Sequence, residues 1–247
     1  RYVVEDATGA MFRSVACYDP YTQRVFLTAR DTGSIYSLRV NSDGTFDRDS
    51  FLETKLESNV TSSPAVYRGR VYVGNGGQGS TGKVSVLDAE TLELLYQVDL
   101  LTQTSPIITT AYATPENGYQ VYVYFMQYNS NDNGIYVLAD SQNNNGDNPG
   151  TLTKLITPSV KQYTTSNVVA FSEGTMYCYN DSGNLFCFGW KDPQDAQYTV
   201  QDVENAIDCL PDPENLTLLE QYDLQRAKER FDALTSQEQA QVSNGEK

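Results

Sequence analysis

The chain has 247 residues, no histidine, and 17 Lys and Arg against 32 Asp and Glu, which gives a formal net charge of −15 at pH 7. Without imidazole, nucleophilic triads built on histidine and zinc sites that need it are excluded. An acidic chain with no basic stripe repels phosphate backbones, so we expect no nucleic-acid partner. No apolar run reaches the length of a membrane span.

The sequence opens at Arg1, with neither an initiating Met nor a signal peptide. We therefore expect a processed or excised piece of a longer protein. The 18 Tyr and 9 Phe against a single Trp fit half-exposed β-strand surfaces better than a helical core.

One pattern occurs four times in the first three quarters of the chain: a hairpin, a Gly-bearing turn and a further apolar strand. The units start 46, 50 and 55 residues apart, counted from Val25, Val71, Val121 and Met176, which suits blades of about four short antiparallel strands. Residues 121–126 are apolar at nearly every position, so both faces of the sheet must be covered. The second strands of the hairpins are residues 25–27, 71–73, 121–123 and 176–178, and the further, third strands are residues 35–38, 84–87, 135–138 and 185–188.

Residues 62–98 carry the most specific sequence motifs, which are Ser62-Ser63-Pro64 before one strand and Leu87-Asp88-Ala89-Glu90-Thr91 at the end of another. This stretch resembles the repeat of quinoprotein-type (PQQ-like) β-propellers. In that family a Gly stands at the position of Leu92, and a Trp that docks one blade on the next stands at the position of Tyr96. The likeness is strong in the second repeat, partial in the third and weaker in the other two, and it covers about residues 14–190.

The resemblance implies an all-β fold over residues 1–190, a β-propeller of four-stranded antiparallel blades. Four blades are few for this family. Either further blades of the same parent protein complete the ring, or the four blades close on themselves. An unclosed arc would leave strand edges exposed to another chain.

Beyond Trp190 the strand pattern stops, and residues 191–201 read as a linker to a helical segment at residues 202–247. Asp202 is a candidate helix cap, and Thr235 with Glu238 forms a capping box for a later helix. The segment resembles the small helical (FIVAR-like) spacer repeats of Gram-positive surface proteins, with a third helix that should continue past Lys247. The alternative is an ordinary helical extension.

Cys178 and Cys187 flank the hairpin turn at Ser182-Gly183. If those two residues form the tip, the two cysteines lie directly opposite each other and can form a cross-strand disulfide. The alternative is that both are small buried hydrophobic residues. A zinc site is excluded, because the sequence has neither a CxxC pair nor histidine.

Asn129, Asn131 and Asn133 alternate before a glycine, and Asp140 stands at the distance of the last ligand of a calcium loop. The three neutral amides and the following strand favour a plain hairpin turn over a calcium site.

Three functions remain. Quinone-dependent dehydrogenases of the similar family hold their cofactor with vicinal cysteines, a stacking Trp and an acidic calcium cluster. This chain has no adjacent cysteines, and its only Trp ends the last blade, so we expect no cofactor and no such enzyme. A glycan-binding or glycan-active propeller is the second function, since tyrosines stack on sugars and paired carboxylates hydrolyse glycosides. We favour the third, a non-catalytic scaffold for a protein or glycan ligand, in an exported bacterial protein that is extracellular or on the cell surface.

Overall fold

A computed structural model describes residues 10–77, 81–129, 131, 133–164, 169–170, 175–188, 198–208, 210, 213 and 221–245. The chain divides into two compact units, Arg1–Phe188 and Gly189–Lys247. The described part of the first unit is built from β-strands and one short 3₁₀ turn, and the described part of the second is mainly helical.

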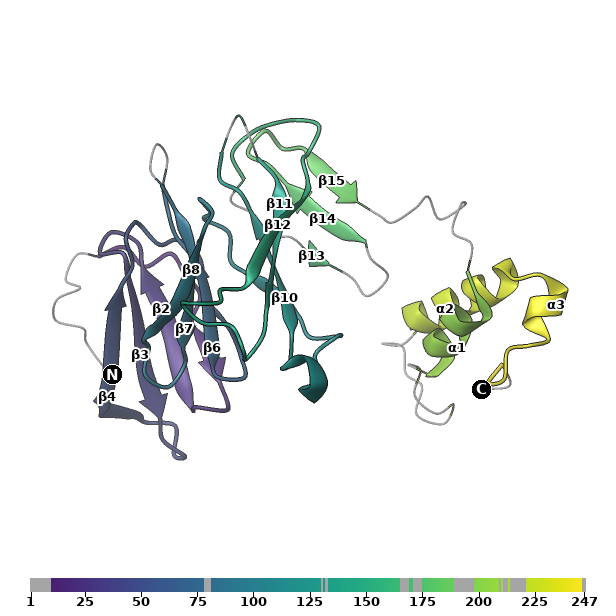
Figure 1. Cartoon of the computed structure of the whole chain (residues 1–247), viewed down its shortest axis with the longest axis horizontal. Helices are drawn as coiled ribbons and strands as arrows, with labels where there is room; N and C mark the ends of the chain where they lie inside the picture. Colours follow the sequence, from purple (N-terminus) through teal and green to yellow (C-terminus); the bar gives the residue numbers. More distant parts are fainter. Residues whose placement is uncertain are drawn as a thin grey trace. The chain divides into compact units, whose positions relative to one another are not determined.

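Four antiparallel sheets follow one another along the first unit, each made of strands consecutive in sequence (Figure 1). We call these sheets blades 1 to 4. Blade 4 has three strands among the described residues. The strands of blade 1 are β1 (Cys17–Asp19), β2 (Arg24–Ala29), β3 (Ser34–Val40) and β4 (Phe46–Lys55); of blade 2, β5 (Ala65–Tyr67), β6 (Arg70–Gly74), β7 (Lys83–Asp88) and β8 (Leu94–Asp99); of blade 3, β9 (Ile107–Thr109), β10 (Val121–Met126), β11 (Ile135–Asp140) and β12 (Thr151–Ile156); of blade 4, β13 (Val169–Ala170), β14 (Met176–Tyr179) and β15 (Leu185–Phe188).

The core lies in the seams between neighbouring blades. Phe26 of β2 packs with Leu87 of β7 in the seam of blades 1 and 2, and Tyr72 of β6 packs with Val123 of β10 in the next seam. All five residues of β6 are buried, because successive side chains enter opposite seams. Sheets packed face to face in this way are the blades of a β-propeller, and the predicted fold class is confirmed.

The first strands of blades 1 and 2, β1 and β5, lie beside each other, as do those of blades 2 and 3, β5 and β9. Serines of the Ser62-Ser63-Pro64 segment form hydrogen bonds that link these first strands. Ser63 Oγ accepts a hydrogen bond of 2.8 Å from the Val15 amide, and Ser105 Oγ accepts one of 2.9 Å from the Ser63 amide. Ser62 Oγ accepts one of 3.3 Å from Gly74 at the end of β6. These serines therefore hold the first strands of neighbouring blades together.

The second unit contains α1 (Val200–Asp208), α2 (Gln221–Ala233) and α3 (Ser236–Gln239). Val203, Ile207 and Ala227 form its core with two leucines. The predicted capping box of Thr235 is confirmed. The predicted cap Asp202 is wrong, because the helix starts two residues earlier: the Thr199 hydroxyl accepts a hydrogen bond from the Asp202 amide, and the Asp202 carboxylate accepts one from the Thr199 amide. None of the described helices has the length and apolar character needed to cross a bilayer.

Candidate functional site

Alternate connections between antiparallel strands emerge at one end of the blades. The turn face, as we define it, consists of residues 20–23, 41–45, 68–69, 89–93, 110–120 and 141–150 of blades 1 to 3. Aspartates fix two of these turns. Asp88 Oδ1 accepts hydrogen bonds of 2.8 Å from the amides of both Glu90 and Thr91, and Asp19 accepts one of 3.1 Å from the Tyr21 amide. Such Asx turns hold the backbone rigidly.

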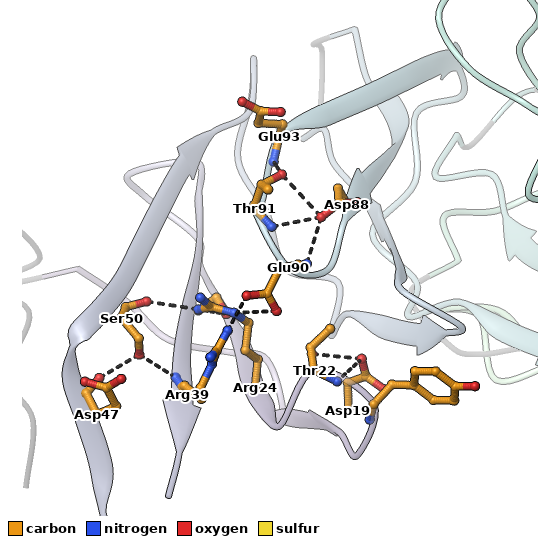
Figure 2. Close-up of polar contacts among 12 residues, drawn as sticks. Asp19, Thr22, Arg24, Arg39, Asp47, Ser50, Asp88, Glu90, Thr91 and Glu93 are labelled. Carbon is orange, nitrogen blue, oxygen red and sulfur yellow. Dashed lines mark hydrogen bonds and ion pairs between the residues drawn. The ribbon is translucent and has the colours of Figure 1, made fainter.

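The turn at residues 89–93 presents Glu90 to two arginines of blade 1 (Figure 2). Glu90 Oε1 pairs with Arg39 Nη2, and Glu90 Oε2 lies 3.7 Å from Arg24 Nε. Arg24 is 6% exposed and donates from Nη1 to the Ser50 carbonyl at 2.9 Å, whereas Glu90 is 51% exposed. This group spans the seam of blades 1 and 2, with one carboxylate beside two guanidinium groups.

A second charged group, fully buried, spans the seam of blades 2 and 3. Asp140 accepts from Arg70 Nε at 2.8 Å and from Arg70 Nη2 at 3.1 Å, and the Tyr72 and Tyr96 hydroxyls donate to it at 2.7 and 2.5 Å. Burial, and then the neighbouring carboxylate, raise the pKa of the Tyr72 and Tyr96 phenols far above the ordinary value. All four side chains are structural, because their polar groups face one another away from solvent.

Tyr96 thus does what the resemblance implied for the family's Trp, since its hydroxyl contacts the next blade. The backbone at Leu92, where the resemblance implies a glycine, has a conformation that glycine favours. The φ of Leu92 is +60°, in the left-handed region, while its side chain is 1% exposed in the seam of blades 1 and 2.

An arginine of blade 2 lies between a tyrosine of blade 1 and a tyrosine of blade 3 on the turn face, and the loop of residues 110–120 carries a further exposed tyrosine. The Arg68 guanidinium carbon lies 3.6 Å from the Tyr119 ring centre and 5.8 Å from the Tyr21 ring centre. Tyr21 is 72% exposed, and Tyr112, which meets Tyr122 edge to face at 5.9 Å, is 68% exposed. We call Tyr21, Arg68, Tyr112 and Tyr119 the aromatic strip. Cation–π stacking holds its arginine in place.

The calcium interpretation is wrong, because Asp140 forms an ion pair with Arg70, accepts hydrogen bonds from two tyrosines and is 0% exposed. Asn133 is also fully buried, and neither polar atom of its side chain has a hydrogen-bond partner among the described residues. The Asn129 side chain accepts from the Asn131 amide at 2.8 Å, as in a plain turn. The loop residues and Asp140 therefore do not form one ligand set.

The predicted pairing of Cys178 with Cys187 is also wrong. The register pairs Cys178 with Phe186 and Tyr177 with Cys187. Cys178 is buried against blade 3, while Cys187 is exposed, and both thiols are free. The alternative, that both cysteines are small buried residues, is confirmed for Cys178 and wrong for Cys187, which is exposed. Trp190 and Cys209 lie outside the described residues.

The sequence does not predict the aromatic strip. Arg68-Gly69 and Asn117-Gly118 have only the composition of a turn between two strands. The positive φ angles of Arg68, at 46°, and Tyr119, at 56°, turn their side chains away from the strand pattern. No sequence period identifies such neighbours, because they come from different blades.

Comparison with models of known protein families gives no match, and no curated protein matches. Solved structures do match. A putative 6-phosphogluconolactonase from Bacteroides uniformis superposes with a TM-score of 0.50 at 14% identity, over 77% of this chain and 54% of that one. The quinohemoprotein alcohol dehydrogenase ADHIIG from Pseudomonas putida matches with a TM-score of 0.42 at 15% identity, over 69% of this chain and 33% of that one. The likeness concerns the fold. The chain spans between a third and about half of the length of these proteins.

Proposed function

We propose that the propeller unit is a non-catalytic binding scaffold that takes a protein ligand on its turn face. The observation that carries this proposal is the aromatic strip. Tyr21 and Tyr112 expose more than two thirds of their surface, and Arg68 is stacked on Tyr119 and lies 5.8 Å from the Tyr21 ring centre. Tyrosine and arginine dominate the residues that contribute most to protein–protein affinity.

The rigidity of the turns supports the same proposal. The Asp19 carboxylate accepts hydrogen bonds from the Tyr21 and Thr22 amides, and Gly118 adopts a φ of 66° just before Tyr119. Ordered side chains lose little conformational entropy on binding, so a contact made through them keeps more of its energy.

A peptide display library and a glycan array, both screened against the full chain, test the proposal. A peptide that binds through the strip should lose roughly 30-fold in affinity with Tyr21→Ala, the effect of removing a binding hot spot. The matched control is Phe46→Ala, which removes an aromatic residue that is 42% exposed on β4. Peptides that bind both variants equally would refute the assignment of the turn face. Binders only on the glycan array would replace the protein ligand with a sugar, for which exposed tyrosines are also suited.

We extend the proposal to location, outside the cell or on a bacterial surface, on the support of the helical segment's resemblance to surface-protein spacers. Fractionation of the source cells, followed by detection with an antibody, tests this part separately. Recovery only from the cytosolic fraction would refute it without affecting the binding proposal.

A further inference from the structure

Arg68 makes its contacts with aromatic rings rather than with anions. Its guanidinium carbon lies 3.6 Å from the Tyr119 ring centre and 5.8 Å from the Tyr21 ring centre, and these two rings belong to blades 3 and 1. The side chain is half-buried, and among the described residues no hydrogen bond or ion pair holds its guanidinium group. The ring contacts therefore fix the position of the arginine without using its hydrogen-bond donors.

Stacking on a ring leaves the donors of an arginine available to a ligand. The guanidinium group is planar and carries five N–H donors in its plane, whereas a stacked ring covers only one of its faces. A carboxylate that lies in that plane can accept two parallel hydrogen bonds from the arginine. Arg68 can therefore bind a carboxylate while it remains stacked on Tyr119.

The two rings that hold this guanidinium group lie on ordered turns. The Tyr119 amide donates to the Thr114 carbonyl at 2.7 Å, and Asn117 Oδ1 accepts from the Thr114 amide at 3.0 Å. On blade 1, the Asp19 carboxylate accepts from the Tyr21 amide at 3.1 Å. The arginine is thus positioned before a ligand arrives, which reduces the entropy lost on binding.

Every other charged residue of the turn face is acidic. Glu90 is paired with two arginines of blade 1 (Figure 2). The other acidic residues are exposed, and they are Asp43, Glu93, Glu116 and Asp147. An acidic group of a ligand is repelled by these carboxylates and attracted by the guanidinium group of Arg68. The face therefore disfavours acidic ligands in general and accepts a carboxylate at one position.

We propose that Arg68 binds one carboxylate of the protein ligand, and that the ligand presents this carboxylate among uncharged or basic residues. This inference rests on the proposed binding of a protein ligand to the turn face. The net charge of −15 supports the second part, because it repels a strongly acidic ligand at long range as well. The carboxylate belongs either to an acidic side chain or to the C-terminus of the ligand, two sources that amidation of the C-terminus distinguishes.

The probes are peptides selected on the full chain from a library displayed with free C-termini and then synthesised. In separate versions of each peptide, every Asp or Glu is replaced by its amide, or the C-terminus is amidated, and isothermal titration calorimetry measures the affinity. On the unmodified chain one of these changes should weaken binding roughly tenfold, as expected for the loss of a charged partner at an interface. On Arg68→Gln the same change should have no effect, because its partner is already absent.

Two variants separate this contact from general effects of charge. Arg13→Gln changes the net charge by the same amount at an exposed residue outside the turn face, and it should alter the affinity by less than about twofold. Arg68→Lys keeps the charge but lacks the planar fork of donors, so it should bind the peptide roughly fivefold more weakly than the unmodified chain. Equal affinity with lysine would show that charge alone attracts the peptide, and the inference would be wrong.

The outcomes distinguish this inference from the proposed function. If the peptide change weakens binding equally on the unmodified chain and on Arg68→Gln, or if the selected peptides share no carboxylate, the inference is overturned. Stronger binding by Arg68→Gln together with weaker binding by Glu116→Gln would show that a cation of the ligand lies here instead. Peptides that still lose affinity with Tyr21→Ala would leave the turn-face proposal standing in these cases, whereas peptides insensitive to that change would overturn both.

Discussion

Asp140→Asn is the sharpest test of how the blades are held together. The substitution preserves the size of the side chain and removes one charge from the seam of blades 2 and 3. Asp140 is 0% exposed and Arg70 is 5% exposed, so the arginine would remain buried with no counter-charge. The amide NH2 would replace one of the two carboxylate oxygens, so it would point donors at Arg70 and at either Tyr72 or Tyr96, which are themselves donors to that position.

The expected loss of stability follows from that arrangement. Breaking a buried ion pair by removing one partner costs about 3–5 kcal/mol, because the other charge is left uncompensated. Arg70→Met should cost a similar amount, since it leaves the Asp140 carboxylate with only two phenol donors. In the double variant neither charge remains, so its loss should fall short of the sum of the single losses by at least about 2 kcal/mol.

Urea unfolding of the full chain, followed by circular dichroism of the β-sheet signal, measures these losses. Glu57→Gln is the control, because it removes the carboxylate that lies 3.5 Å from Lys83 Nζ. The Glu57 and Lys83 side chains are 64% and 30% exposed, so water screens their pairing, and its removal should cost about 1 kcal/mol or less. A loss below about 1 kcal/mol for Asp140→Asn, or strictly additive losses in the double variant, would refute the assigned role of the buried pair.

Three further predictions concern other residues. The raised phenol pKa values of Tyr72 and Tyr96 keep both protonated in the folded state while the unfolded state loses these protons, so stability should fall above about pH 10, by about 1.4 kcal/mol for each tyrosine at pH 11. Urea midpoints between pH 9 and 11 measure this loss, Tyr96→Phe should reduce it, and a flat profile would contradict it. At Leu92, both Ala and Gly remove a buried side chain, but Gly relieves the positive φ, so Leu92→Gly should be about 1 kcal/mol more stable than Leu92→Ala in thermal or urea unfolding. The reverse order would show that the backbone relaxes. Alkylation of the native protein at pH 8, mapped by mass spectrometry, should modify exposed Cys187 much faster than Cys178, whose pKa burial raises to about 11. Equal rates, or a peptide linking the two residues, would contradict the observed register.

The repeat pattern was sufficient to predict the blades, because each strand must bury side chains on both faces. Apolar residues at nearly every position of residues 121–126 require that both faces of this short antiparallel sheet be covered. At two positions the sequence departs from the pattern it resembles, and the structure gives the role of the residues present. Tyr96 reaches the neighbouring blade with its hydroxyl, and Leu92 adopts the backbone conformation of a glycine.

The hairpin of blade 4 shows why register was harder to predict. A two-residue tip at Ser182-Gly183 places the two cysteines opposite each other. The structure instead places Gly183 at a φ of 74° after a hydrogen bond from its amide to the Asn180 carbonyl, which makes a three-residue tip. One added residue shifts the pairing by one position, and each cysteine then points to a different face. The length of the turn, and not the hydrophobic pattern, therefore determines which residues of β14 and β15 pair.

The candidate binding site could not be predicted from the sequence, because its residues come from different blades. Arg68 and Tyr119 are 51 positions apart and belong to different blades, yet the guanidinium stacks on the ring. Their contact depends on the angle between neighbouring blades, which is set by the seams. The buried Arg70 and Asp140 pair lies in the same seam, only two residues along the chain from Arg68. Loss of that pair should therefore disturb the aromatic strip as well as stability, so the seam that holds the blades also sets the shape of the proposed binding surface.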